Sequence, residues 1–193
     1  MICMTAPTAK EAAAQSSRVR GFTLIELLVT LTIAAIIASA AIPSFTWSMS
    51  AYRISSQING WIGDMQFARA EAIKRGQTVT LCISSNGTSC ATATTVWNNG
   101  WIVFADANGN ATVDAGEAVL RRQTLLTGGN ALTADNNVRA ITFNRDGFAV
   151  GLPAGNVTLT LRDSTTSSGL TRCVALTTVG RTSVQRAGTG NCS

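Results

Sequence analysis

Hydrophobic and polar positions divide the chain into parts with different periodicity. Residues 22–42 are apolar or small throughout, apart from Glu26, a few threonines and Ser39. As an α-helix rising about 1.5 Å per residue, this run would span roughly 30 Å, the thickness of a bilayer core. The pattern therefore predicts a membrane-spanning helix near the N-terminus.

After Pro43 the apolar residues recur at steps of three and four, which is typical of an amphipathic helix with one buried face. Lys74 and Arg75 followed by Gly76 predict its C-terminus. We therefore expect the membrane helix to continue as an amphipathic helix over residues 43–76. Its expected core positions are Ile54, Ile58, Trp61 or Ile62, Met65, Ala68 and Ala72.

Short runs rich in Val, Ile, Thr and Leu follow, separated by Gly and Asn turns, and such runs predict β-strands. The expected fold class is α+β: a long N-terminal helix, half membrane-spanning and half amphipathic, packed on a mostly antiparallel β domain of two sheets over residues 77–193. The predicted strands lie within residues 78–84, 100–106, 117–123, 138–144, 156–163, 171–178 and 181–186.

Composition argues against an enzyme. The chain of 193 residues is 46% hydrophobic and 13% charged, and it contains no histidine. Histidine is the commonest general base and a common metal ligand, so its absence removes most hydrolase constellations. No G-x-S-x-G elbow or P-loop occurs either. We expect a protein that is not an enzyme and has no cofactor or bound metal.

The charges around the apolar run predict its orientation. Lys10, Arg18 and Arg20 precede the run, and Arg53 is the first charged residue after it. The positive-inside bias therefore keeps the N-terminus in the cytoplasm and exports the β domain. Since three of the basic residues lie before the run, the net charge of +5 is not by itself evidence for nucleic acid.

Glu26 separates three interpretations of the apolar run. A secretory signal peptide would be cut near Ala41, but its apolar region is typically about 7–15 residues and gains nothing from an acid. In a plain membrane anchor, an acidic residue at mid-bilayer costs about 2.5–3.5 kcal/mol. The third interpretation gives the carboxylate a partner outside its own chain.

That interpretation rests on a resemblance. The stretch "GFTLIELLVTLTIAAIIASAAIP" is similar to the class III signal of type IV pilins and type II secretion pseudopilins. In that family a prepilin peptidase cuts after the glycine and methylates the new N-terminal residue. The resemblance implies a leader over residues 1–21, cleavage after Gly21, N-methylation of Phe22, and a helix bend at Pro43.

The same resemblance implies the partner of Glu26. Once the leader is removed, the chain begins with a cation at Phe22, and Glu26 of one subunit can neutralise the amine of a neighbour inside an apolar filament core. Glu26 is therefore expected to act in subunit assembly. The implied partners are the prepilin peptidase, other major and minor pilins or pseudopilins, and the inner membrane, with the β domain in the periplasm.

Two further stretches narrow the resemblance. "FARAEAIKRGQTVTLCISSNGTSC" and "WNNGWIVFADANGNATVDAGEAVLR" resemble the FimT, FimU and GspH branch of minor pilins and pseudopilins. This implies a minor type IV pilin that initiates or caps the pilus and supports twitching, adhesion or DNA uptake. The alternatives are a minor pseudopilin of type II secretion and a pilus-associated DNA receptor.

The cysteines predict disulfides. Cys3 falls in the leader, which leaves Cys82, Cys90, Cys173 and Cys192 in an exported domain, where two disulfides are favoured over thiols. Three pairings are possible. We favour Cys82 with Cys90 and Cys173 with Cys192, because each closes a local loop between neighbouring runs. A zinc site has no CxxC pair or histidine to support it.

The segment "DANGNATVDAGE" has the spacing of an EF-hand-like calcium loop. However, Ala111 stands where that loop has its glycine, and the flanking runs are predicted strands. Ordinary hairpin-turn chemistry is therefore favoured over calcium. The residues at the first, third, fifth, ninth and twelfth places are Asp106, Asn108, Asn110, Asp114 and Glu117.

The C-terminal tail raises DNA as a possible partner. FimT-type members of the family bind DNA through a Gly-Arg-x-Arg motif, and Gly180 and Arg181 match its start. Ser183 occupies the place of the second arginine, so Arg186 would have to replace it. Arg181 and Arg186 can contact phosphates, but an edge strand and a disulfide-closed loop is the favoured interpretation of this tail.

Overall fold

The computed structural model describes residues 21–192. Lys10, Arg18, Arg20 and the expected leader up to residue 20 lie outside the described residues. The chain divides into two units, unit 1 (Met1–Pro43) and unit 2 (Ser44–Ser193), which are described separately.

The helix α1 (Leu24–Arg75) contains the amphipathic segment and all of the apolar run except its first two residues, Phe22 and Thr23. At its start, the Thr23 hydroxyl accepts a hydrogen bond from the backbone N–H of Glu26 at 3.3 Å, which satisfies one of the N–H groups left open in a first turn. At its end, Gly76 adopts a φ of +65°, the left-handed conformation that commonly terminates helices. The helix therefore ends where the sequence predicts.

In unit 2 the helix presents its predicted face to the core. Trp61 is fully buried and Ile62 only half-buried, which decides between the two positions that the sequence left open. The Trp61 ring meets the Trp97 ring edge-on, with centroids 6.1 Å apart. The confirmed buried positions are Ile54, Ile58, Trp61, Met65, Ala68 and Ala72.

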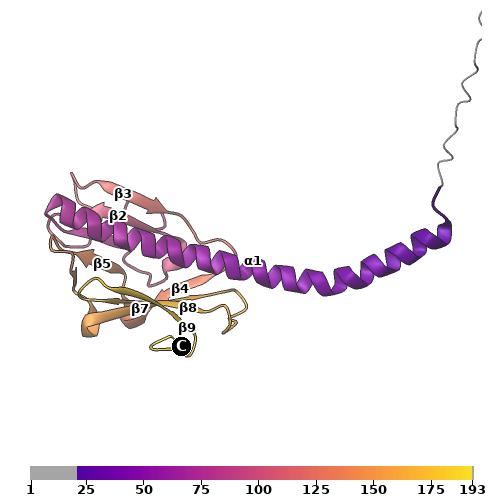
Figure 1. Ribbon diagram of the computed structural model, residues 1–193. Coiled ribbons are helices and arrows are strands. Elements are labelled where there is room, and N and C mark those ends of the chain that lie inside the picture. Colours follow the sequence, from indigo (N-terminus) through magenta and orange to yellow (C-terminus); the bar gives the residue numbers. More distant parts are fainter. Residues whose placement is uncertain (1–20, 193) are drawn as a thin grey trace, which may run out of the picture. The chain divides into compact units, whose positions relative to one another are not determined.

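Two antiparallel sheets complete unit 2, as predicted. One has the strand order β3-β2-β1-β5-β6 and the other β4-β7-β8-β9, and Figure 1 shows the C-terminal part of α1 lying across both. The first sheet consists of β1 (Val79–Ile83), β2 (Trp101–Ala105), β3 (Val119–Gln123), β5 (Ala140–Phe143) and β6 (Ala149–Val150). The second consists of β4 (Ala131–Ala134), β7 (Asn156–Arg162), β8 (Arg172–Thr177) and β9 (Thr182–Arg186).

All the predicted strands are present, but β4 and β6 were not predicted. Each forms an edge of its sheet, and β4 pairs with β7 whereas β6 pairs with β5. β6 has only two residues, and two of the four residues of β4 are alanines. Such short segments show too little alternation and contain too few β-branched side chains to indicate a strand. Pairing to a longer neighbour therefore determines both strands.

Two strands of the first sheet, β1 and β2, are covered on both faces. Every residue of β1 and β2 is buried. Their inner faces join the main core beneath α1, while Cys82, Ile102 and Phe104 form a second cluster on the outer face, against Cys90 and Val113 from the adjoining loops. This double covering explains why β2 is continuously apolar rather than alternating and why β1 has one polar residue, Thr80, whose hydroxyl is hydrogen-bonded to Asp106.

A substitution at Gly100 tests the close packing of the chain at the start of β2. It leads into β2 with a φ of +112°, and an added Cβ would lie 2.5 Å from the Gln123 carbonyl oxygen and 2.9 Å from that of Ser84. Gly100→Ala is therefore expected to lower the free energy of unfolding by at least about 2 kcal/mol in chemical denaturation.

The matched control is Gly116→Ala. Gly116 also has a positive φ, +93°, but nothing lies within 4 Å of an added Cβ, so only backbone strain of about 1 kcal/mol applies. Equal destabilisation by the two substitutions would show that the close contacts at Gly100 do not matter.

Candidate filament-assembly site

The described part of unit 1 exposes an almost wholly apolar helix. α1 contains a window long and apolar enough to cross a membrane, and no part of that window is buried. Such a surface needs lipid or other apolar helices to cover it. The exposed large side chains are Phe22, Leu24, Ile25, Leu27, Leu28, Val29, Leu31, Ile33, Ile36, Ile37 and Ile42.

Glu26 is the one charged residue among residues 21–43. It lies in the first turn of α1, where a carboxylate interacts favourably with the helix dipole. It is exposed and forms no ion pair with any residue in the range 21–192. The chain itself, as far as the structure describes it, therefore leaves this carboxylate without a counter-charge.

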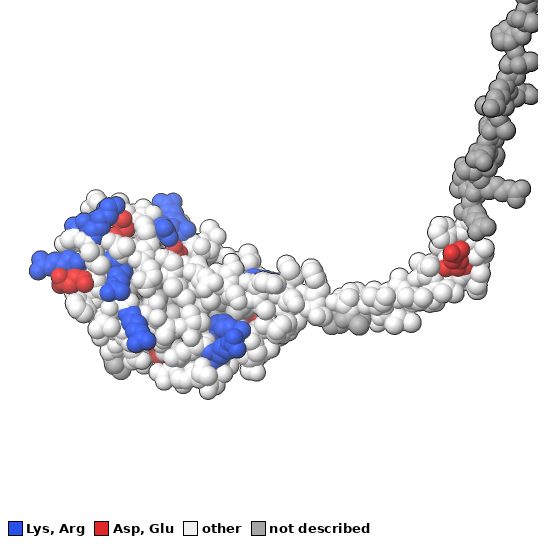
Figure 2. Space-filling model, viewed as in Figure 1, with Lys and Arg blue, Asp and Glu red and all other residues white. Residues whose placement is uncertain are grey.

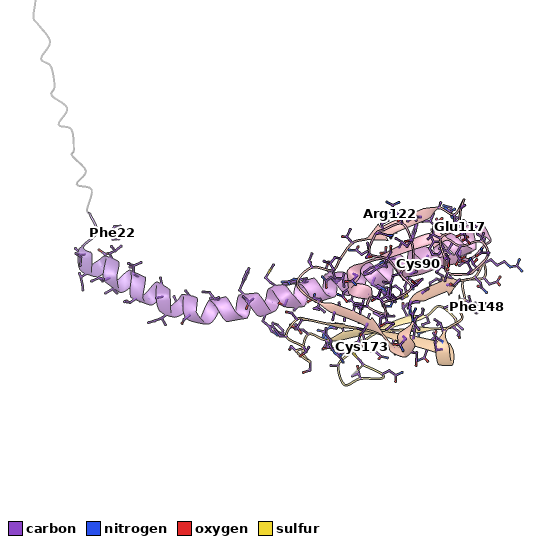
Figure 3. All side chains as sticks on the ribbon, turned by 180° about the vertical axis from the view of Figure 1, so that it is seen from behind. Phe22, Cys90, Glu117, Arg122, Phe148 and Cys173 are labelled. Carbon is purple, nitrogen blue, oxygen red and sulfur yellow. A yellow bond between two sulfur atoms is a disulfide. The ribbon has the colours of Figure 1, made fainter. Side chains whose placement is uncertain are left out.

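The structure brings the predicted processing and assembly residues together at this end of the helix. Gly21, Phe22, Thr23 and Glu26 line one shallow pocket, and Figure 3 shows Phe22 at the start of α1. After cleavage, each subunit would therefore have the amine of Phe22 and the carboxylate of Glu26 at the same end of its helix. Pro43 lies within α1, and the bend expected there stays a prediction.

Two disulfides have the pairing that the sequence favours. Cys82 in β1 is joined to Cys90 in the following loop, with a Cα–Cα distance of 5.6 Å. Cys173 in β8 is joined to Cys192, with a Cα–Cα distance of 5.5 Å. Figure 3 shows Cys90 and Cys173 in different regions of unit 2. The second bridge therefore ties the C-terminal tail back to the second sheet.

The loop between β2 and β3, over residues 106–117, satisfies its carboxylates internally. Asp106 is buried and accepts hydrogen bonds from the Thr80 hydroxyl (2.7 Å) and from the backbone N–H groups of Asn110 (3.1 Å) and Ala111 (2.9 Å). Glu117 accepts from the backbone N–H groups of Ala107 (2.9 Å) and Asp114 (3.0 Å). These contacts fit the turn interpretation.

Asp114 completes the same network. Its carboxylate accepts hydrogen bonds from the side-chain amides of Asn108 and Asn110, both at 2.8 Å. Within residues 21–192, no group of three or more His, Cys, Asp or Glu side chains is placed to hold a metal ion. The carboxylates of the loop are directed at its own donors.

Three carboxyl groups of unit 2 have a lowered pKa. Hydrogen bonds from Arg75 and Lys74 lower the pKa of Glu71. Those from Asn108 and Asn110 lower the pKa of Asp114. Burial raises the pKa of Asp163, but hydrogen bonds from Thr165 and Ser167 outweigh it. In each case the folded chain prefers the charged form.

These shifts predict acid sensitivity. A lowered pKa in the folded state stabilises the fold above the ordinary pKa of the group, 3.8 for Asp and 4.5 for Glu, and this stability is lost as pH falls through the folded-state pKa. In urea denaturation we expect the free energy of unfolding to fall as pH decreases from 5 to 3. Asp114→Asn should make this decrease smaller, whereas a rise in stability toward acid would contradict the assignment.

The C-terminal arginines do not form one site. Arg181 is exposed in the turn before β9, where its carbonyl oxygen accepts from the Thr177 backbone N–H at 3.0 Å, whereas Arg186 ends β9. Five residues of extended chain separate them by roughly 16 Å. Arg186 instead lies opposite Arg172 of β8 in the strand register. The sequence analysis did not identify Arg172. Treating residues 172–186 as a hairpin with its turn near Gly180 would have paired Arg172 with Arg186.

Basic and acidic side chains are concentrated in unit 2. On the face shown in Figure 2, the Lys and Arg side chains form several separate groups rather than one continuous stripe. A stripe would be the ordinary electrostatic footprint of a nucleic-acid-binding surface. The visible face therefore does not favour DNA.

Comparison with known proteins supports an assembly subunit. The profile of the family described as "Type II transport protein GspH" matches residues 57–180, more than half of the chain. The profile described as "Prokaryotic N-terminal methylation motif" matches residues 16–42. No curated protein sequence matches the chain.

Solved structures share the fold. The type IV minor pilin FimU of Pseudomonas aeruginosa (strain PAO1) has a TM-score of 0.55 at 19% identity, over 68% of this chain and 87% of that one. The minor pseudopilin EpsH from the Type 2 Secretion System of Vibrio cholerae has a TM-score of 0.50 at 13% identity, over 70% of this chain and 98% of that one. At such identities the likeness shows the type IV pilin fold alone.

The methylation motif implies processing by a prepilin peptidase and assembly with other pilins or pseudopilins. The uncovered apolar helix fits a membrane-anchored subunit, and the structural relatives are minor pilin and pseudopilin subunits rather than enzymes. Because the GspH profile covers the last part of α1 and every strand except β9, the chain belongs to the GspH family, and its fold is that of the type IV pilin-like proteins.

Proposed function

We propose that this protein is a minor type IV pilin, a structural subunit that initiates or caps the pilus. Residues 22–42 hold the precursor in the inner membrane, with the N-terminus in the cytoplasm and residues 77–193 in the periplasm. Prepilin peptidase cuts after Gly21 and methylates Phe22. Twitching, adhesion or DNA uptake would then depend on the protein indirectly, through the pilus.

The observation that carries this proposal is the apolar surface of unit 1, which none of the described residues covers. A helix that only anchored the chain would need no charge. Glu26, without an ion pair among residues 21–192, supports a helix that must match a charged partner in another subunit.

A minor pseudopilin of type II secretion is the second candidate. It is supported by the match to the GspH profile and by the shared fold with EpsH. Maturation and helix packing would be the same, and the filament would be a short periplasmic one. DNA is not part of either proposal, because Arg181 precedes β9 whereas Arg186 ends it, so the two arginines do not form one site.

Deleting the gene and scoring two phenotypes separately tests the choice. We expect sheared surface pili to fall at least tenfold and to be restored by the wild-type gene, while secretion of type II substrates stays unchanged. Lost secretion with normal piliation would assign the protein to the pseudopilus instead. If neither changes, the role in filament assembly is wrong.

A further inference from the structure

Unit 2 begins with exposed aromatic residues. Trp47 is 57% exposed, and Tyr52, the one tyrosine of the chain, is 74% exposed. Trp and Tyr rings are enriched at membrane–water interfaces, where the apolar ring and its polar group both find suitable surroundings. The other three tryptophans are fully or almost fully buried: Trp61, Trp97 and Trp101.

Trp47 also lines a pocket of about 530 Å³ that contains two arginines. Arg172 in β8 and Arg186 in β9 are direct partners in the antiparallel register, so their side chains leave the sheet on the same face. The Arg172 guanidinium is held in place by donating to the carbonyl oxygens of Gly169 (2.9 Å) and Thr171 (2.8 Å). The remaining wall is formed by Ser168, Gly169 and Ala187.

These two arginines lack counter-charges. Among residues 21–192, neither forms an ion pair with a carboxylate. Asp163 lines a neighbouring pocket that shares Trp47, but its carboxylate accepts hydrogen bonds from the Thr165 side chain and the Ser167 backbone N–H. The pocket is therefore positively charged, and two guanidinium groups match the several oxygens of a phosphate group.

A short stretch of chain connects Trp47 to the apolar run. Trp47 follows Ile42, the last residue of the apolar run, by five residues, so it lies at most about 18 Å from the end of that run. The polar headgroup layer begins there and extends roughly 5–8 Å beyond the hydrocarbon core. A lipid headgroup at this surface is therefore within reach of the segment that carries Trp47.

We propose that Trp47, Arg172 and Arg186 form a binding site for the phosphate of an anionic phospholipid in the periplasmic leaflet. The bound lipid would hold unit 2 at the membrane surface until the subunit enters the filament. This inference rests on the proposed anchoring by residues 22–42. The exposed aromatic residues and the short connection to the apolar run favour lipid over DNA as the source of the phosphate.

The test uses the mature full-length protein in dodecylmaltoside micelles, titrated with phosphatidylglycerol or phosphatidylcholine, with bound lipid counted by native mass spectrometry. The wild type is expected to bind phosphatidylglycerol at least about tenfold more tightly than phosphatidylcholine. In the double variant Arg172→Gln, Arg186→Gln this preference should fall to about twofold or less. Trp47→Ala alone should reduce it about threefold, because the arginine pair remains.

The matched control is Arg122→Gln with Arg145→Gln. Both arginines are exposed, line other pockets and give the same loss of charge, so the lipid preference should stay near the wild-type value. An equal loss in both double variants would show a general charge effect and overturn the site. Absence of any preference in the wild type would overturn it as well.

Competition identifies the source of the phosphate. Inorganic phosphate or soluble glycerol phosphate at millimolar concentration should not displace the lipid, and displacement would assign the pocket to a small anion. Tighter binding of a DNA duplex, lost in the pocket double variant, would make it a nucleic-acid site. Either result overturns the lipid proposal. The pocket double variant should still fractionate with membranes, since its release would count against anchoring by residues 22–42 instead.

Discussion

Glu26→Ala is expected to reduce incorporation of the subunit into filaments at least tenfold while leaving folding and leader cleavage largely intact. The side chain is exposed and has no ion-pair partner in the described part of its own chain, so unit 2 should not depend on it. In a filament core, the amine of a neighbouring Phe22 would lose its counter-charge. Removing one member of a buried pair costs about 3–5 kcal/mol, which exceeds a tenfold effect.

The measurement is the ratio of the protein in sheared filaments to that in membranes, by immunoblot. Two conservative variants separate charge from size. Glu26→Gln removes the charge at nearly constant volume and should reduce incorporation into filaments as much as Glu26→Ala does. Glu26→Asp should retain part of the wild-type incorporation. Normal incorporation of Glu26→Gln would mean that charge pairing is not the role of this residue.

Trp97→Ala is expected to lower the free energy of unfolding of unit 2 by about 3–5 kcal/mol. The ring is fully buried, packs edge-on against Trp61, and donates a hydrogen bond from its indole N–H to the Val138 carbonyl oxygen at 2.9 Å. Truncation to alanine removes the buried apolar surface, the contact with Trp61 and the hydrogen bond to Val138, all where α1 packs on the sheets. Urea denaturation followed by circular dichroism measures the loss.

Trp47→Ala serves as the control for this substitution, because Trp47 is exposed and should lose less than about 1 kcal/mol. Trp97→Phe should lie between the two, since it keeps much of the apolar volume but leaves the Val138 carbonyl oxygen unpaired. If Trp97→Ala proved as stable as Trp47→Ala, the Trp61–Trp97 contact would not be part of the stabilising core.

The fold was largely predictable because its main signals are local. The three- and four-residue spacing of Ile54, Ile58, Met65 and the small residues beyond them marks the buried face of α1, and the described structure buries each of these positions. The edge strands β4 and β6 were missed, because they exist only through pairing with β7 and β5. Periodicity within one segment cannot indicate a strand that depends on its neighbour.

The candidate sites also differ in whether the sequence alone could indicate them. Glu26 is conspicuous in the sequence as a charge in an apolar run, and the roles proposed for Gly21 and Phe22 come from resemblance to a known signal. Arg172 and Arg186 lie fourteen residues apart, and only the β8–β9 register makes them neighbours. Arg181, which sequence spacing had grouped with Arg186, is separated from it by the length of a strand.

The identity of the N-terminal residue tests the central claim most directly. Mass spectrometry of the protein purified from membranes should find a chain beginning with methylated Phe22. Gly21→Leu should abolish this species without disturbing the described fold, because nothing lies within 4 Å of a Cβ added at Gly21. A chain beginning at Ala41 would identify a cleaved secretory signal peptide and contradict the assignment of this protein as a filament subunit.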